Sequence, residues 1–507
     1  MTPHELVVDI TDRFGPRPAT STSERHAAEW FAQQCDQYGL AVEIQEFDTT
    51  RSSGFSLALL YFLPLIPILA SRFTREIPFV NWLWVILLAA CIVLLALQLR
   101  GRSFLNAIFP KGPSQNVVAR CNDGTTGDKL RKVVFVSHLD TPFVSPLNTE
   151  ATATLHRRLT DYAFYYLLAA LPLLAFLAFD FDFMEFTLFD VAIDLQLWLW
   201  VLLAILSVVP AILALDALVM SLLRKQSPGA NDSASGLAVL LSMVEALARE
   251  RGGTIESHEF STASMSAVSA DEQLRQASDL DQPGLTDWLE LDDMFDTRAD
   301  AHASNSTFGP WETLDSNTGS FEATSAAPAQ RTTVTQPMRT VANIGGLSSG
   351  MYGLEGFSAM LDGKEVWFVA TGARHADAAG MQALLYEYGE ELRDALIVNL
   401  ESVGLGNLQW YTREGAPLTV SISSRVMSLA KRAAREKDLR ISPYKGVTGI
   451  TDATPALTHH HKAGTITRLL SKGFPEAYRT VDDFADATDA VVLDETVQFA
   501  LEFLAQA

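Results

Sequence analysis

Four apolar runs, each close to the length of a membrane span, constrain this 507-residue chain more than any other feature. About 20 predominantly apolar residues are needed for a helix to cross a bilayer. The alternative is four buried core helices, but the runs come as two close pairs rimmed by tryptophans, which favour membrane–water interfaces. The sequence therefore predicts an integral membrane protein with four transmembrane helices, at roughly Phe55–Ser71, Phe79–Leu97, Tyr162–Phe179 and Leu195–Leu223.

Basic residues at the ends of these runs predict the orientation. The runs are flanked on the side of the polar segments by Arg51, Arg100, Arg102, Arg157, Arg158, Arg224 and Lys225. On the opposite side, one loop holds Arg72 and Arg75, and the other has no basic residue between Asp180 and Asp194. Because positive charge collects on the cytoplasmic side of a membrane, we expect the polar segments to face the cytoplasm.

The polar segments alternate between strand and helix patterns. Short β-branched runs of the buried-strand kind lie at Val133–Val136, Val366–Ala370 and Ala395–Leu400. They alternate with stretches of helical periodicity at Gly236–Leu247, Ala378–Tyr388 and Ser424–Lys437. Strands separated by helices predict an α/β fold with a mostly parallel sheet flanked by helices.

Three insertions divide this predicted α/β domain. Its parts are residues 1–54, 101–160, 225–252 and 341–507, separated by transmembrane hairpins at 55–100 and 161–224 and by a segment at 253–340. That segment is rich in Ser, Thr, Asp and Glu and cannot bury enough apolar surface to fold alone, so we expect a disordered acidic insertion. The net charge of −22 argues against nucleic acid as a partner, since nucleic-acid binding needs a basic surface.

Residue types that bind metals follow the predicted strands. His138 and Asp140 come directly after one strand, Glu401 ends another, and Asp232 lies in a turn that opens a helix. In open α/β sheets, functional groups gather beyond the carboxyl ends of the strands. One imidazole with two or three carboxylates suits zinc or another divalent cation. Taken singly, each residue also has a plainer interpretation, because His and Asp at strand ends are often caps.

The order of these pieces resembles the aminopeptidase Y / bacterial leucyl aminopeptidase family of co-catalytic zinc peptidases. The resemblance covers roughly residues 1–54, 101–156, 225–250 and 345–507, and the Asp232 segment is its most specific part. It rests on Gly15–Pro18, the His138/Asp140 pair, Gly229–Gly236, Val369–Gly372 and Asn399–Glu401, in that order. It implies zinc-dependent hydrolysis of N-terminal peptide bonds, with a peptide or aminoacyl substrate.

The resemblance also implies roles for individual residues. It implies one zinc position held by His138, Asp232 and Glu401, with Asp140 as the catalytic-site carboxylate that orients neighbouring ligands. In the family, the second zinc uses the second residue of a Glu-Glu pair and a histidine near the C-terminus. The first glutamate of that pair is the general base that activates the bridging water.

Two arginines stand where the family has catalytic groups. Arg374 aligns with the base, His375 with a ligand, and Arg479 with the last histidine ligand. A guanidinium stays protonated and has no lone pair to offer, so neither arginine can act as base or ligand. Both would repel a second cation, or would replace its charge beside Asp232. The sequence therefore predicts one zinc ion at most, or none, with His375 as an added ligand and Asp377 as a substitute base.

Two functions remain open. One is a membrane-bound metallopeptidase with altered or lost activity, and the other is an inactive pseudopeptidase that binds peptides or regulates a partner. A transporter component is a third reading, but four spans with almost no buried charge offer it no substrate path. The run His459–His461 is predicted to be a surface loop, because consecutive residues do not all face one ion.

Overall fold

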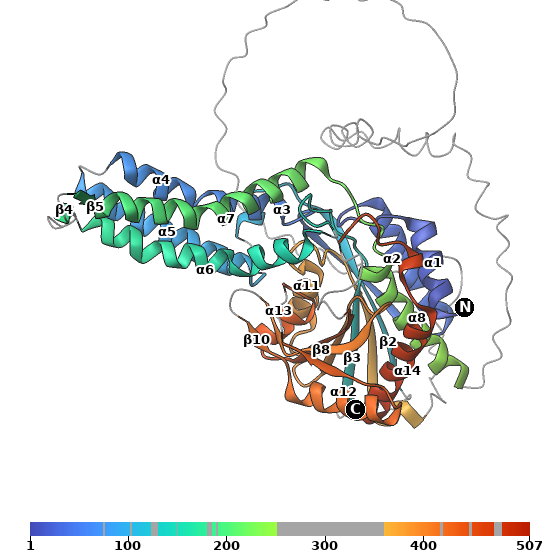
Figure 1. The fold of residues 1–507 in the computed structure, drawn as a ribbon. Coiled ribbons are helices and arrows are strands. Elements are labelled where there is room, and N and C mark those ends of the chain that lie inside the picture. Colours follow the sequence, from blue (N-terminus) through green and yellow to red (C-terminus); the bar gives the residue numbers. More distant parts are fainter. Residues whose placement is uncertain are drawn as a thin grey trace, which may run out of the picture. The chain divides into compact units, whose positions relative to one another are not determined.

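The computed structural model describes most of the chain outside the acidic segment (Figure 1). The described residues are 1–74, 77–101, 104–122, 130–149, 151–179, 185–188, 191–250, 359–415, 419–445, 449–470 and 479–507. The predicted disordered insertion at 253–340 lies outside them, as do Arg75 and Arg102 of the orientation argument.

An eight-stranded mixed sheet lies at the centre of the α/β domain, in the order β1-β2-β6-β3-β7-β12-β8-β11. The strands β6, β3, β7 and β12 pair in parallel, whereas β1 with β2, β2 with β6, and β12 with β8 pair antiparallel. The bounds are β1 (Ala41–Thr49), β2 (Gly112–Asn122), β3 (Arg131–His138), β6 (Lys364–Thr371), β7 (Leu396–Leu400), β8 (Asn407–Tyr411), β11 (Ser442–Tyr444) and β12 (Lys462–Leu469). The predicted α/β class is thus confirmed, with a parallel centre and antiparallel pairs on both sides of it, followed by a parallel pair of β8 with β11 at one edge.

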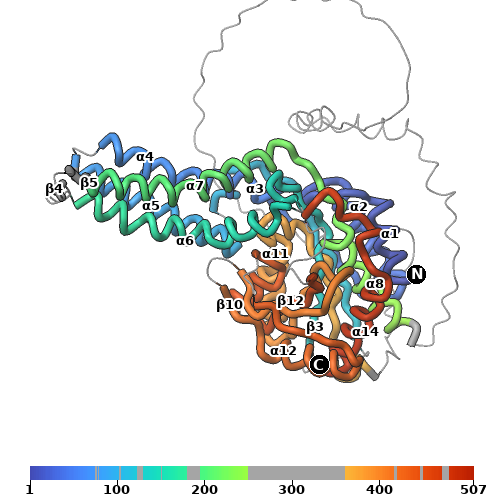
Figure 2. Tube along the Cα trace, in the orientation of Figure 1, coloured from blue at the N-terminus to red at the C-terminus, as the bar shows by residue number. Residues whose placement is uncertain are grey.

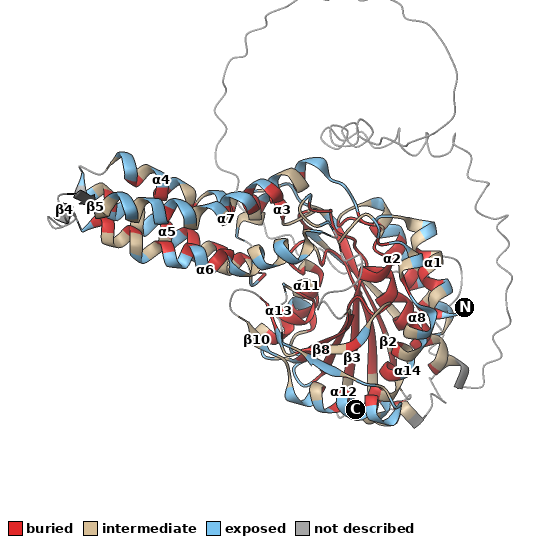
Figure 3. Cartoon of the chain, in the orientation of Figure 1, coloured by how far each residue is buried: buried red, intermediate tan, exposed pale blue. Residues whose placement is uncertain are grey.

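Helices cover both faces of this sheet because successive strand residues point to opposite sides. Val133 and Phe135 of β3 pack in the larger apolar cluster, beneath α1 (Pro3–Phe14), α2 (Thr22–Gln37), α8 (Ser235–Glu250), α12 (Ser424–Glu436) and α14 (Ala490–Gln506). Val134 and Val136 pack on the other side against α11 (Ala379–Tyr388) and α13 (Ala453–Thr458). The strands are accordingly buried between the two helical layers (Figure 3). Helices α1 and α14, from opposite ends of the chain, contact each other (Figure 2).

Short elements complete the domain. Four are single turns of helix: η1 (Leu105–Ala107), η3 (Ala230–Ala234), η4 (Ala359–Leu361) and η5 (Ala485–Ala487). Two are small antiparallel pairs: β9 (Arg413–Glu414) with β10 (Val420–Ser421), and β4 (Glu185–Leu188) with β5 (Val191–Asp194). The β4–β5 pair lies in the loop between the third and fourth apolar runs, where no strand is predicted from the sequence.

Four helical segments of the described chain are long and apolar enough to cross a bilayer. The first joins α3 (Gly54–Phe62) to α4 (Leu65–Phe73), and the others are α5 (Pro78–Gln98), α6 (Ala153–Ala178) and α7 (Leu195–Leu223). They pack on one another through an apolar cluster, yet many of their large apolar side chains are exposed, among them Phe79, Ile86, Ile205 and Leu215 (Figure 3). These helices match the four apolar runs predicted from the sequence, although α6 begins nine residues before Tyr162.

The first helical hairpin is inserted between two strands that are neighbours in the sheet. Strands β1 and β2 pair antiparallel, from Ala41 opposite Arg120 to Thr49 opposite Gly112. Helices α3, α4 and α5 all lie between these strands in sequence. The two ends of the hairpin are therefore held together by the pairing of Thr49 with Gly112.

Candidate metal site

His138 is the last residue of β3, and the sheet brings two further chain segments to it. In the parallel register, His138 lies opposite Thr371, the last residue of β6. Strand β7, on the other side of β3, ends at Leu400, directly before Glu401. The carboxyl ends of three parallel strands thus meet here, at the edge where functional groups gather in open α/β sheets.

Asp232 is fixed in a buried turn, η3, which opens helix α8. The turn follows Gly229, whose φ of 70° is left-handed, and a Cβ at this position would lie 2.3 Å from Cγ2 of Thr141. Only glycine fits both restrictions. Asp483 accepts hydrogen bonds from the backbone N–H groups of Asn231 (2.7 Å) and Asp232 (3.1 Å). Burial, together with the charge of Asp232, raises the pKa of Asp483 to about 7.

Arg17 ties the same turn to the end of β3. Its Nε donates to the carbonyl of Leu139 (3.0 Å), and its Nη2 donates to the hydroxyl of Ser233 (3.1 Å). Ser233 in turn donates to the carbonyl of His138 (3.1 Å). Burial lowers the pKa of Arg17 to about 10, so the guanidinium stays charged at neutral pH. The Gly15–Pro18 segment therefore contributes a buried cation that holds the two loops of the site together.

His375 lies in a loop after β6 whose backbone is strained. Three of its residues have a left-handed φ although none is glycine: Ala373 (52°), Asp377 (64°) and Ala378 (54°). Such conformations cost on the order of 1–3 kcal/mol each and persist only where the surroundings hold them. The carboxylate of Asp140 holds the middle of the loop, accepting from the backbone N–H groups of Arg374 (2.8 Å) and His375 (2.9 Å). Asp140 thus orients the loop that carries His375.

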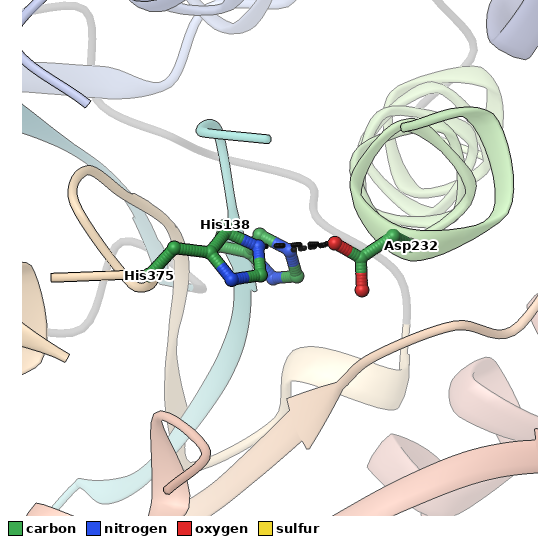
Figure 4. A group of neighbouring side chains, drawn as sticks. All are labelled: His138, Asp232 and His375. Atoms are coloured by element: carbon green, nitrogen blue, oxygen red, sulfur yellow. Dashed lines mark hydrogen bonds and ion pairs between the residues drawn. The ribbon is translucent and has the colours of Figure 1, made fainter. Parts of the chain in front are cut away.

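His138, Asp232 and His375 form the group best placed to bind a metal ion, with ligand atoms all within 4.8 Å of one another (Figure 4). Oδ2 of Asp232 lies 3.0 Å from Nε2 of His375 and 3.7 Å from Nε2 of His138. Two ligands about 2.0–2.1 Å from a tetrahedral zinc ion are about 3.3 Å apart, so these distances suit one zinc ion. Both ring nitrogens of His138, and Oδ1 of Asp232, are buried without a hydrogen-bond partner among the described residues. The residues present therefore fit a single zinc ion.

Burial and charge set the protonation of this group. Burial lowers the pKa of His375 to about 4, so its ring is neutral at pH 7. Burial alone would also lower the pKa of His138, but its interaction with Asp232 outweighs burial and raises that pKa. For Asp232, burial acts to raise the pKa, and the two histidines overcome it and hold the pKa well below its usual range. Asp232 is therefore an anion at neutral pH, as a metal ligand must be.

Glu401 lies outside this group because Arg374 pairs with it. The guanidinium of Arg374 and Oε1 of Glu401 form an ion pair in which both side chains are buried. The other oxygen, Oε2, accepts from Nδ2 of Asn399 (3.3 Å). The sequence predicts Glu401 as a ligand beside His138 and Asp232. In the structure, His375 lies beside these two residues, and Glu401 forms an ion pair with Arg374.

Arg374 also fixes the tautomer of His375. Its Nη1 lies 3.1 Å from Nδ1 of the imidazole. A guanidinium can only donate, so Nδ1 accepts, and the proton of the neutral ring is on Nε2, which donates to Asp232. A metal bound at Nε2 would move that proton to Nδ1, against the guanidinium. Arg374 therefore competes with a metal ion for His375 as well as for Glu401.

Two further residues were predicted for the site, Asp377 and Arg479. Oδ2 of Asp377 accepts from Nε2 of Gln98 (2.8 Å) and from Nδ2 of Asn106 (2.8 Å), and Asp377 lies outside the group of three ligands. The carbonyl of Arg479 accepts from Nδ2 of Asn148 (3.1 Å), and its φ of 55° is left-handed. Asp377 thus faces the end of helix α5 and the turn η1.

The three consecutive histidines are separate from this group. His459 and His460 are exposed after helix α13, and Nδ1 of His461 lies 3.1 Å from the carbonyl of Leu392. Among the described residues, none of the three belongs to the group of possible ligands. Their position is that of the surface loop predicted from the sequence.

Sequence reasoning missed two buried acids that belong to the site. Asp483 was detectable, because it lies four residues after Arg479, which aligns with the last histidine ligand of the family that the sequence resembles. For Asp452, no pattern in the sequence indicated a residue of the site. It accepts from Oγ1 of Thr371 (2.8 Å), and its Oδ1 has no hydrogen-bond partner in the described chain. Burial raises the pKa of Asp452 to about 6, against the charge of His138. Asp452 is therefore a buried carboxyl poised near neutral pH.

No protein-family model and no curated protein matches the sequence. One solved structure similar to it is an aminopeptidase from Aneurinibacillus sp. strain AM-1, with 12% identity and a TM-score of 0.45, covering 99% of this chain and 93% of that one. A second is a Zn-dependent exopeptidase from Parabacteroides distasonis, with 10% identity and a TM-score of 0.44, covering 99% of this chain and 96% of that one. Another is a glutaminyl cyclase from Bacteroides thetaiotaomicron, bound to N-acetylhistamine (12%, 0.43, 99% and 96%). Similarities this weak leave the function to be argued from the residues of the chain itself.

Proposed function

We propose that the chain is a membrane-anchored, zinc-dependent aminopeptidase-like protein that acts on the N-terminal residue of a peptide or aminoacyl substrate through one zinc ion. The observation that carries this proposal is the buried group of His138, Asp232 and His375, whose ligand atoms lie within 4.8 Å of one another. Three protein ligands leave a fourth position open, which is typical of catalytic rather than structural zinc sites. A bound zinc ion supplies Lewis acidity toward a substrate carbonyl and toward water.

The other residues of the site argue for altered activity. Arg374 stands at the place of the usual base and cannot accept a proton, because its guanidinium stays charged. Asp377 is a poor substitute, since two amide groups already donate to its carboxylate. We assign the proton acceptor to Asp452, which has an unpartnered oxygen and a pKa raised by burial to about 6. Hydrolysis should therefore be slower than with a paired-glutamate base.

The four apolar helices are proposed to cross the bilayer. Their length, their apolarity and their exposed large apolar side chains support this, since a soluble protein rarely exposes apolar surface of that extent. The basic residues at the polar ends of the helices support a cytoplasmic α/β domain. A cysteine introduced at exposed Glu390 should then react with an impermeant maleimide only after permeabilisation, and one at exposed Ile77, between α4 and α5, in intact cells. Natural cysteines should add little background, because Cys35, Cys91 and Cys121 are buried.

A second function is favoured by the contacts of Arg374. The guanidinium pairs with Glu401 and fixes the tautomer of His375, so both of these residues have a partner other than a metal ion. In this alternative, the chain is an inactive pseudopeptidase that binds peptides without hydrolysing them, and Arg374 carries the positive charge that a second metal would supply.

Metal analysis of the purified full chain, combined with an aminopeptidase assay, separates the two. The single-zinc enzyme predicts one zinc ion per chain and slow hydrolysis, both lost in His138→Ala. His461→Ala is the matched control, since it removes a histidine outside the ligand group. No zinc in the wild-type protein would refute the enzyme and favour the pseudopeptidase. One zinc ion with hydrolysis that depends on His138 would refute the pseudopeptidase.

A further inference from the structure

Both ends of the first helical hairpin contact the loop that carries His375. Ser53, which precedes α3, donates to the carbonyl of His375 (3.4 Å). Gln98 is the last residue of α5 and is almost completely buried. Its Nε2 donates to Oδ2 of Asp377 (2.8 Å), and Nδ2 of Asn106 in η1 donates to the same oxygen (2.8 Å). The end of helix α5 thus contacts Asp377, which lies two residues after His375, a possible zinc ligand.

Hydrogen bonds to Asp377 and packing of the buried Ala378 hold this end of the loop. Asp377 and Ala378 have a left-handed φ, which is costly for residues that carry a Cβ. On the side of Asp377, the loop borders a cavity of about 150 Å³, also lined by Asn106 and Lys111. Beside this cavity, the amides of Gln98 and Asn106 hold the carboxylate of Asp377, and Nε2 of Gln382 donates to its carbonyl (2.6 Å). A carboxylate acceptor makes both of these hydrogen bonds stronger than neutral ones.

We infer that Gln98 and Asn106 are positioning residues for metal binding: through Asp377 they set the place of His375, so the first hairpin governs the affinity of the site for zinc. This inference rests on the zinc site proposed above and adds that the first hairpin, which we propose to cross the membrane, affects its affinity for zinc. Asp140 also holds the middle of the loop, at the N–H groups of Arg374 and His375. Loss of the hairpin contact should therefore weaken zinc binding rather than abolish it. Residues that orient metal ligands in this way typically change affinity by about 10- to 100-fold.

The test measures metal affinity, not activity. Full-length wild type and Gln98→Ala, purified in detergent, are titrated with zinc against a chromophoric chelator. They are also loaded with cobalt, whose absorption reports the geometry of its ligands. We expect zinc binding about 10- to 100-fold weaker in Gln98→Ala, with a changed cobalt spectrum. Asn81→Ala is the matched control, because it removes a buried amide from the opposite end of the same helix α5.

A charge exchange shows whether the contact itself matters. Gln98→Glu sets a second carboxylate against Asp377 and should weaken zinc binding. Adding Asp377→Asn restores a donor–acceptor pair and should return the affinity toward wild type. If Gln98→Ala misfolds, Asn106→Ala tests the same oxygen from outside the apolar helix.

The possible outcomes separate this inference from the proposed function. Wild-type protein that binds neither zinc nor cobalt refutes the zinc site, and the inference with it. Wild-type protein that binds zinc, with Gln98→Ala and Asn106→Ala binding it equally well, refutes the inference alone. So does an equal loss of affinity in Asn81→Ala, since the effect would then follow from general weakening of the hairpin.

Discussion

Replacing Arg374 with methionine removes the guanidinium that pairs with Glu401 and leaves a buried carboxylate without a counter-charge. The two side chains are only 2% and 3% exposed. Removing one partner of such a buried pair typically costs about 3–5 kcal/mol. Each kcal/mol shifts the Tm of a domain of this kind by roughly 2–4 °C. In the presence of chelator, the Tm of Arg374→Met should therefore fall by roughly 6–20 °C.

Zinc should reverse this loss, because the substitution also frees two ligands. Without the guanidinium, Glu401 can bind a metal, and Nδ1 of His375 can take the ring proton and release Nε2. Arg374→Met should therefore bind zinc more tightly than wild type does. Zinc at 100 times its Kd stabilises the folded state by about 2.7 kcal/mol, which recovers a large part of the loss.

Thermal unfolding of the full chain in detergent, followed by tryptophan fluorescence with chelator and then with zinc, measures both effects. The control is the double variant Arg374→Met with Glu401→Gln, which leaves no unpaired charge and should be more stable than Arg374→Met alone. An unchanged Tm in chelator would refute the reasoning, because the ion pair would then contribute nothing. So would zinc affinity lower than in wild type, because Arg374 would then assist the metal instead of competing with it.

Three further substitutions test other parts of the structure. Burial raises the pKa of Glu414 to about 7, so its protonated form stabilises the fold at low pH. The contribution of this proton to the free energy of unfolding is about 3 kcal/mol, complete below pH 4.5 and lost as the pH rises through 7. Glu414→Gln cannot lose a proton, so the fall of Tm between pH 5 and 8 should be smaller in this variant. Gly380→Ala would place a Cβ 2.2 Å from the carbonyl oxygen of Gly372 and should cost about 1–3 kcal/mol, so an unchanged Tm would contradict the close packing. Asp452→Asn should slow hydrolysis by about 100-fold or more at unchanged zinc content, and an unaltered rate would remove Asp452 from the mechanism.

The centre of the fold could be predicted from local sequence, whereas its edges could not. Strands β3, β6 and β7 are β-branched runs buried on both faces, and such runs have a signal of their own. Strand β2 is antiparallel to β6 and contains Pro113, Ser114 and Asn116, so its pattern resembles a loop more than a strand. Its place depends on pairing with β1 and β6, which are distant in sequence.

The residues of the site were predictable where they lie at the end of a strand or the beginning of a helix. His138 and Asp232 were found because each directly follows or begins a regular element. The pairing of Arg374 with Glu401 was not foreseeable, because it depends on two strand ends meeting across the sheet. The direction of Asp377 was not foreseeable either, since it follows from a left-handed backbone that any helix prediction beginning at Ala378 would miss.

The strand order has a consequence for synthesis of the chain. Strand β12, near the C-terminus, lies between β7 and β8 and is the only element that joins them in the sheet. The apolar helices α3 to α7 leave the ribosome long before it, and they would enter the bilayer first. If these helices cross the bilayer as proposed, the nascent protein is tethered to the membrane with an open edge on β7, exposed to wrong pairing, until Lys462–Leu469 emerges. Completion of the sheet should therefore wait until Lys462–Leu469 has been translated.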